Sequence, residues 1–127
     1  MIAIDTSSWI AFFSDREPDG DDTALVESAL ADRQACLPPV VLTEILSDPS
    51  LPSSVTTSLL ELPMLETGPG FWERAGRMRA RLLAENHRAR LADTLIAQIC
   101  VDHGVRLVTR DTDFRHFARL AGLRLAL

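Results

Sequence analysis

The chain has 127 residues, 46% of them hydrophobic and 24% charged, with a formal net charge of −5. This length suits one domain with its own core, so we expect a single domain over residues 1–127. No apolar run is long enough to span a membrane, and Asp5 interrupts an N-terminal stretch that lacks the basic leader of a signal peptide. We therefore expect a cytoplasmic protein without a membrane partner.

Charge is unevenly distributed along the chain. Residues 1–66 carry 12 acidic and 2 basic residues, whereas residues 67–127 carry 6 acidic and 11 basic ones. Every basic residue is arginine, which excludes a P-loop lysine or a Schiff-base lysine. The two cysteines, Cys36 and Cys100, lack the spacing of zinc ligands, and we expect both to be buried free thiols.

In the first half of the chain, short apolar runs alternate with stretches of helical periodicity. Proline and glycine mark the breaks between them. We expect a strand at Met1–Ile4, a helix from Thr6 to about Phe13, a loop at Asp15–Asp22, a helix with Leu25 and Ala29 inward, a strand at Ala35–Leu37, a helix from Pro38–Pro39 to about Ser47, and a helix opening at Pro52 with Val55, Leu59 and Leu60 inward.

The second half repeats this alternation. We expect a strand at Met64–Glu66, a break at Gly68–Gly70, a helix with Phe71, Ala75, Met78 and Leu82 on its apolar face, a helix at Ala92–His103, a strand at Arg106–Thr109, a helix from Asp111 to about Ala121, and a last strand at Leu123–Leu127. Strands that alternate with helices predict a three-layer α/β/α sandwich around a mainly parallel sheet.

Two aspartates follow predicted strands. Asp5 comes directly after the first strand, and Asp111 comes shortly after Val108. Because ligands of parallel sheets bind at the carboxyl ends of the strands, both side chains are expected at one edge of the sheet. Each could instead be a helix N-cap, a position that favours aspartate.

Two further acids lie within predicted helices. Asp93 precedes Ile96 and Cys100 by three and seven residues and so shares their buried face, although a cap would also explain its place in the sequence. Glu44 falls inside a helix, where a cap cannot explain it, and the alternative is a lateral position at the solvent boundary. Converging carboxylates repel one another, and a bound Mg²⁺ or Mn²⁺ relieves that repulsion. This set therefore suggests a metal-dependent phosphodiesterase.

The segments that carry these acids resemble one family. D-T-S after the first strand, the mid-helix Glu44, A-D-T-L-I-A and L-V-T-R-D-T-D-F are similar in order to the PIN-domain ribonucleases, and within them to the VapC-type toxins of bacterial toxin–antitoxin pairs. The similarity runs from Ile2 to the C-terminus. Two departures are a missing glycine turn in Asn86–Leu91 and the sequence Ile-Leu-Ser-Asp-Pro after Glu44.

The resemblance implies a function and a set of site residues. It implies an α/β/α fold, endonucleolytic RNA cleavage by metal-activated water, a homodimer, and a VapB-type antitoxin whose C-terminal tail covers the active site. RNA rather than DNA is implied by the family alone. Its motif positions give the catalytic and metal-binding acids as Asp5, Glu44, Asp93 and Asp111, with Asp113 as an additional ligand and Thr6 and Thr109 as hydroxyls beside the Mg²⁺ or Mn²⁺.

Arginines cluster in the second half and are candidates for phosphate binding. The alternatives are a solvated helix face or a docking surface for an acidic partner. The residues concerned are Arg74, Arg77, Arg81, Arg88 and Arg90, together with Arg110 beside Asp111. The histidines show no ligand spacing. Two other functions remain open from the sequence: a housekeeping PIN nuclease that processes RNA, and a catalytically inactive PIN-like binding module.

Overall fold

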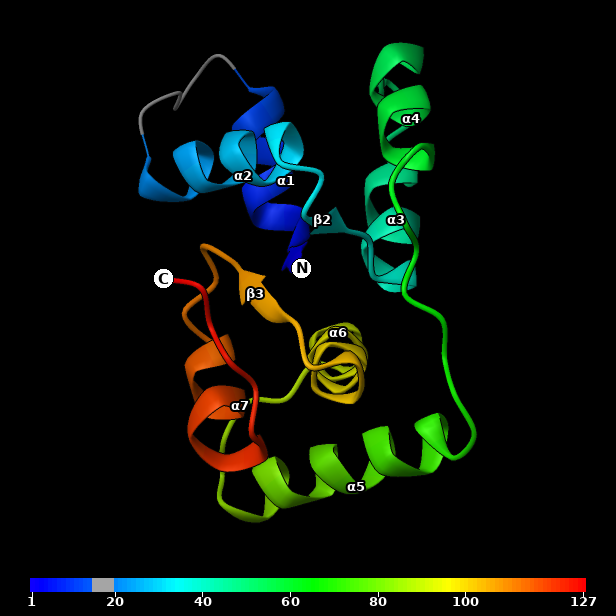
Figure 1. Cartoon of the computed structure of the whole chain (residues 1–127). Coiled ribbons are helices and arrows are strands. Elements are labelled where there is room, and N and C mark those ends of the chain that lie inside the picture. Colours follow the sequence, from blue (N-terminus) through cyan, green and yellow to red (C-terminus); the bar gives the residue numbers. More distant parts are fainter. Residues whose placement is uncertain (15–19) are drawn as a thin grey trace.

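Three short parallel strands form the centre of the protein (Figure 1). The computed structural model describes residues 1–14 and 20–127. Within these residues the strand order is β2-β1-β3, with Ile2 paired to Ala35 on one side and to Arg106 on the other. The elements in chain order are β1 (Ile2–Ile4), α1 (Thr6–Phe13), α2 (Asp21–Ala31), β2 (Ala35–Cys36), α3 (Pro39–Leu46), α4 (Ser53–Leu60), α5 (Phe71–Ala84), α6 (Leu91–His103), β3 (Arg106–Val108) and α7 (Phe114–Ala121).

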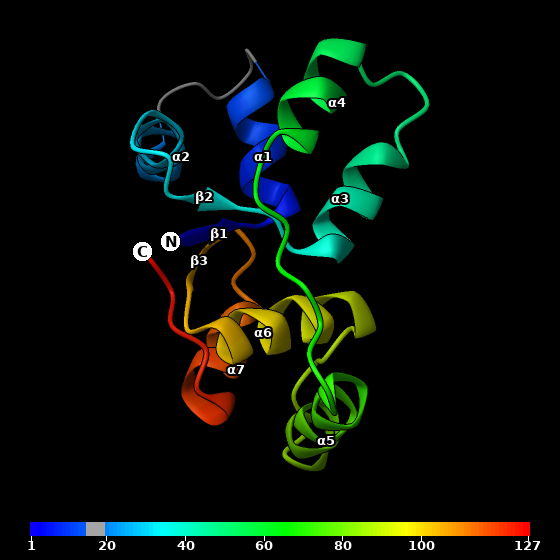
Figure 2. The ribbon, with the colours of Figure 1, turned by 45° about the vertical axis from the view of Figure 1, so that its right-hand side comes forward.

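Helices cover both faces of the sheet, which confirms the predicted α/β/α sandwich. Figure 2 shows α1 and α2 on one side of the strands and α6 with α7 on the other, while α3 and α4 lie beyond the end of the sheet. All three residues of β1 are buried, as expected for a central parallel strand. Helix α6 is buried over most of its circumference, so it forms the core layer beneath the sheet.

Most predicted elements are present, with α1 at the predicted bounds. Of the expected loop at Asp15–Asp22, residues 15–19 lie outside the described residues, and Asp21 and Asp22 already belong to α2. The prediction that Leu60 of α4 faces the core was wrong, since its side chain is 58% exposed. The buried face follows Val55 and Leu59, one helical turn apart, and Leu60 is rotated away from it.

The prediction of two further strands, at Met64–Glu66 and Leu123–Leu127, was also wrong. Met64–Glu66 makes one parallel bridge, from Met64 to Leu37, before Gly68 and the following residues turn the chain away. Leu125 makes one bridge to Leu107 in place of the strand expected at the C-terminus.

The two cysteines are as expected from the sequence. Cys36 and Cys100 are buried free thiols, and burial raises the pKa of both, that of Cys36 to about 11. Among the described residues, none of the helices has the length and apolar character needed to cross a membrane.

Candidate active site

The sheet places Asp5 at the carboxyl edge of its central strand. The backbone N–H of Asp5 donates to the Val108 carbonyl at 2.9 Å, one residue beyond the end of β1. Its carboxylate is buried and accepts hydrogen bonds from Ser7 Oγ and Thr109 Oγ1, both at 2.9 Å. Burial raises the pKa of Asp5, and the hydroxyl groups of Ser7 and Thr109 oppose that shift. Asp5 therefore ties the end of β1 to β3 and to the residue that follows it.

The segment after β3 is a hydrogen-bonded turn. Thr109 Oγ1, which donates to Asp5, accepts from the backbone N–H of Asp111 at 3.0 Å. Asp111 Oδ1 in turn accepts from the backbone N–H of Asp113 at 2.9 Å. Helix α7 begins only at Phe114, so the helix predicted from Asp111 was wrong at its start. The side chain of Asp111 caps this turn instead of the helix.

Asp93 is the third residue of α6 and is partly buried. Arg90 occupies the N-cap position of that helix, so a cap does not explain the aspartate. Burial raises the pKa of Asp93 to about 6, with further increases from the charges of Asp111, Asp5 and Glu44 and an opposing effect of Arg90. Three of the four predicted catalytic acids thus act electrostatically on the carboxyl group of the fourth.

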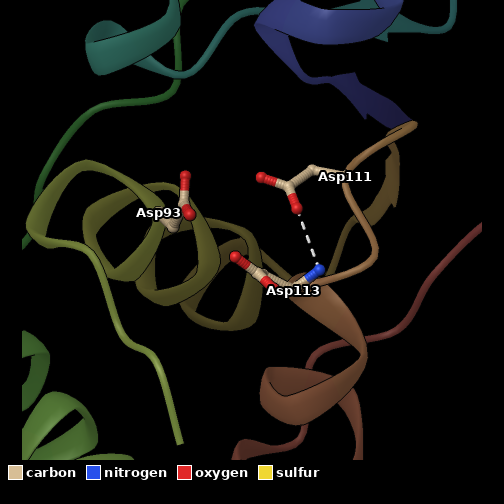
Figure 3. A group of neighbouring side chains, drawn as sticks. All are labelled: Asp93, Asp111 and Asp113. Atoms are coloured by element: carbon tan, nitrogen blue, oxygen red, sulfur yellow. Dashed lines mark hydrogen bonds between the residues drawn. The ribbon is translucent and has the colours of Figure 1, made fainter.

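Three of the acids form a tight cluster. Asp93, Asp111 and Asp113 each offer a carboxylate oxygen, and these oxygens lie within 4.8 Å of one another. Figure 3 shows Asp93 projecting from α6 towards the two aspartates of the turn before α7. Oxygen donors at this spacing suit a hard divalent cation such as Mg²⁺ or Mn²⁺. Burial and, after it, repulsion from the neighbouring acids raise the pKa of Asp93, and a bound cation would offset both effects.

Glu44 and Asp5 lie outside this tight cluster. Glu44 is exposed near the end of α3, in agreement with the alternative of a lateral position at the solvent boundary. Its Oε1 nevertheless accepts a hydrogen bond from Thr6 Oγ1 at 2.9 Å. That contact directs the glutamate towards the first turn of α1, directly after Asp5. The hydroxyls of Thr6 and Thr109 therefore each hold one acid of the quartet.

Arg110 contacts an acid that the sequence analysis did not single out. Its Nε and Nη2 donate to the two carboxylate oxygens of Asp22, at 2.6 and 3.0 Å. Asp22 is buried and also accepts from Ser8 Oγ at 3.1 Å, while the backbone N–H of Arg110 donates to Ser7 Oγ at 3.1 Å. Asp22 belongs to an acidic stretch with proline and glycine, and nothing in that stretch predicts a buried ion pair. Ser7, in contrast, is part of the D-T-S motif, which could have marked it as a site residue.

The arginine stripe of α5 is largely used in helix packing. Arg74 makes an ion pair with Asp102 and donates to the Pro69 carbonyl, and Arg81 donates to the Leu120 carbonyl. Asp102 lies nine residues after Asp93 on α6, which is about 13 Å along a helix. Arg74 is therefore at the opposite end of α6 from the acidic cluster, and Arg77 lines the same hollow as Arg74.

Arg88 lies at the acidic cluster. Its Nη1 is 4.0 Å from Asp113 Oδ2, and its side chain is 65% exposed. Among the arginines predicted to bind phosphate, it combines exposure with closeness to the carboxylates.

An apolar cavity of about 500 Å³ lies between the start of α3, the start of α5 and α6. Pro38 and Val40 of the α3 end, Leu95 of α6 and Trp72 of α5 contribute to its wall. Helices α3 and α6 also carry Glu44 and Asp93, so the cavity adjoins the elements that hold these acids.

Sequence comparison finds one family model. The PIN domain model matches residues 2–120. A VapC ribonuclease of Mycobacterium bovis is 33% identical over 135 residues, covering 99% of this chain and 98% of the relative. Ribonuclease VapC11 of Mycobacterium tuberculosis shows the same identity and the same coverage.

Solved structures share the fold. VapBC2 of Rickettsia felis, bound to a DNA fragment from its promoter, superposes with a TM-score of 0.74 at 19% identity, covering 98% of this chain and 97% of that chain. DNA-bound VapBC of Salmonella typhimurium gives a TM-score of 0.74 at 21% identity, with coverage of 98% and 95%.

Proposed function

This chain belongs to the PIN-domain family, within its VapC-type ribonucleases, and we propose that it is a Mg²⁺- or Mn²⁺-dependent endoribonuclease that acts as the toxin of a toxin–antitoxin pair. One observation carries the metal dependence. Carboxylate oxygens of Asp93, Asp111 and Asp113 lie within 4.8 Å of one another, and burial together with the charges of Asp111, Asp5 and Glu44 raises the pKa of Asp93 to about 6. Such an arrangement is unfavourable without a cation and suited to one.

The residues that would hold the metal come from four separate parts of the chain. Asp93, Asp111 and Asp113 supply the closely spaced oxygens, and Asp5 and Glu44 add two carboxylates whose charges act on Asp93. When bound, the cation supplies positive charge against the scissile phosphate and lowers the pKa of a water.

The chain's own groups keep the acids in place. Thr109 and Ser7 donate to one oxygen of Asp5, so that this carboxylate stays oriented at the strand end. Thr6 restrains the longer side chain of Glu44. Both effects reduce the conformational freedom that the acids would lose on binding a cation and substrate.

RNA as substrate and a role as a toxin are supported by the curated relatives, which are VapC ribonucleases aligned over nearly their whole length. Solved relatives are complexes of a VapBC type, which supports a VapB-type antitoxin as partner. The apolar cavity lined by Pro38, Val40 and Leu95 offers a place for apolar side chains of that antitoxin, on the two helices that also carry Glu44 and Asp93.

A homodimer is the second assembly that we propose. Ile10 is 60% exposed. A hollow of about 200 Å³ is lined by Ile10 and Phe13 together with Ile45 and Val55. An apolar surface of this kind on α1, α3 and α4 is typical of a contact between chains. Light scattering of the purified protein tests this directly, and a monomer at micromolar concentration contradicts it.

Cleavage of single-stranded RNA tests the enzymatic proposal. Protein freed of antitoxin should cut the RNA with Mn²⁺ and lose that activity in EDTA. Asp93→Asn should abolish cleavage while the circular dichroism spectrum stays native. Asp102→Asn is the matched control, since it removes the same charge at the far end of α6. Undiminished cleavage by Asp93→Asn would refute the mechanism, and inactivity of the wild-type protein with both metals would favour a binding module.

A further inference from the structure

A basic segment borders the acidic cluster on one side. Asn86–Arg90, here called the basic segment, connects α5 to α6 and runs past α7 (Figure 1). Arg88 reaches Asp113 at 4.0 Å, and Arg90 lies near enough to Asp93 to act on it electrostatically. The basic segment therefore places two guanidinium groups next to the proposed cleavage site.

The backbone of the basic segment is held by the end of α5. Asn86 has φ +60°, a left-handed conformation that asparagine tolerates, and the backbone N–H of His87 returns to the Leu82 carbonyl at 3.0 Å. Arg79 Nε donates to the Ala89 carbonyl at 2.8 Å. These contacts fix the direction in which the segment presents its side chains.

Two imidazole rings stack beside the arginines. His87 of the basic segment and His116 of α7 have ring centroids 4.2 Å apart and planes inclined by 21°. Arg119 Nη2 lies 3.2 Å from His116 Nδ1, and because a guanidinium only donates, that nitrogen is the acceptor. In neutral His116, Nε2 then carries the hydrogen.

An open hollow of about 560 Å³ lies over the basic segment. Its wall combines cationic and apolar groups, and the residues are Arg79, Leu83, Asn86, His87, Arg88, Ala89 and Arg90. Cationic groups next to planar rings are the combination with which proteins bind single-stranded nucleic acid, because phosphates take the charge and unstacked bases take the rings. A duplex keeps its bases stacked and withholds them from such a surface.

We propose that this surface binds the single-stranded RNA that flanks the scissile bond, with Arg88 and Arg90 on its phosphates and the His87–His116 stack against a nucleobase. The proposal rests on the ribonuclease function proposed above and names the form of RNA that the site accepts. The contact of Arg88 with Asp113 is too long for a hydrogen bond, so the guanidinium can turn to a phosphate without losing one.

Binding is measured separately from cleavage. Each variant is made in an Asp5→Asn background and titrated with a fluorescein-labelled single-stranded oligoribonucleotide, by fluorescence anisotropy in Mg²⁺. The variants are His87→Ala, His87→Phe, Arg88→Ala and His116→Ala. Arg106→Ala is the matched control: it removes the same charge as Arg88→Ala from an exposed site at the start of β3, the edge of the sheet away from the acids.

We expect Arg88→Ala to weaken binding and to reduce the slope of log K against log salt by about 0.7, the value for one phosphate contact on a single strand. His87→Ala and His116→Ala should each weaken binding by about 5-fold or more, the range of a lost stacking contact. His87→Phe keeps a planar ring and should retain the affinity. Arg106→Ala should bind as the parent does, and a duplex of the same sequence should bind less tightly than the single strand.

Two results overturn the proposal while leaving the ribonuclease function intact. In the first, the wild-type protein cleaves RNA, but Arg88→Ala, His87→Ala and Arg106→Ala all bind the single-stranded oligoribonucleotide with equal affinity. The second is a duplex that binds as tightly as the single strand. If His87→Ala is misfolded by circular dichroism, Arg88→Ala and His87→Phe decide the outcome, since weakened binding by His87→Phe contradicts the stacking contact. Failure of the wild-type protein to cleave refutes the ribonuclease function itself, whatever the binding results.

Discussion

Arg110 and Asp22 form a two-point ion pair that joins the turn carrying Asp111 to the first turn of α2. The two hydrogen bonds are 2.6 and 3.0 Å long, and the carboxylate is almost completely buried. Since Arg110 directly precedes Asp111, the pair fixes the backbone from which that acid projects. An arginine that the sequence suggested for phosphate binding thus has a partner within the protein.

Removal of the buried carboxylate should destabilise the fold. Asp22→Asn keeps the shape of the side chain but loses the charge-assisted bonds, and we expect a loss of about 2 kcal/mol in the free energy of unfolding. Urea denaturation followed by circular dichroism measures it. Asp21→Asn, on the exposed neighbouring residue, should change the same quantity by less than about 0.5 kcal/mol. Equal effects of the two substitutions would show that the ion pair contributes nothing.

The same pair predicts a response to acid. Hydrogen bonds from Arg110 hold the pKa of Asp22 below its usual value. The carboxylate therefore stabilises the fold fully above the unfolded-state pKa of about 3.9, and this contribution disappears as pH falls through the lower folded-state value. The stability difference between wild type and Asp22→Asn should be constant above pH 5 and shrink below pH 4. A difference that persists unchanged to pH 2 contradicts this assignment.

Asp93 predicts the opposite trend for the metal-free protein. Because its pKa is raised to about 6, folding favours the protonated form, and the stability this gives is lost as pH rises from about 4 through 6. The melting temperature in EDTA should fall over this range relative to that of Asp93→Asn. Added Mn²⁺ should stabilise the wild type more at pH 7.5 than at pH 5, because protons compete with the cation. Equal stabilisation at both pH values would count against Asp93 as a ligand.

Thr109 offers a test of how the acids are held. Thr109→Val keeps the volume but removes the hydroxyl that contacts Asp5 and the backbone of Asp111. We expect Mn²⁺ affinity, measured by calorimetric titration, to fall by about 10- to 100-fold. Thr109→Ser should restore most of it. Thr57→Val, whose hydroxyl donates only to the Ser53 carbonyl on α4, is the control, and a comparable loss there would contradict a local effect.

The sequence was a good guide wherever periodicity and strand ends carried the information. The apolar run before Asp5 and the helical stripe that includes Ile96 predicted elements that the structure contains, because burial selects those patterns directly. Convergence of the four acids also followed from strand ends and helix phase, and the charges acting on Asp93 agree with it. Their role as metal ligands stays a prediction.

Tertiary contacts account for what the sequence missed. No local pattern distinguishes Asp22, whose partner is 88 residues away, from the other acids of its stretch. Arg74 and Arg81 form a regular stripe, but their donors are used by Asp102 and a carbonyl of the last helix. Whether an arginine is available to a ligand depends on such partners, and spacing along a helix does not reveal them.

The hydrogen bond from Thr109 to Asp5 spans 104 residues of sequence. Asp5, at the end of β1, cannot meet Thr109 until β3 and the turn after it have been synthesised. A ribosome-bound chain that ends before that turn also lacks Asp111 and Asp113. The activity proposed here therefore cannot arise in a growing chain until the segment that carries Asp111 and Asp113 has been made and has met the first strand.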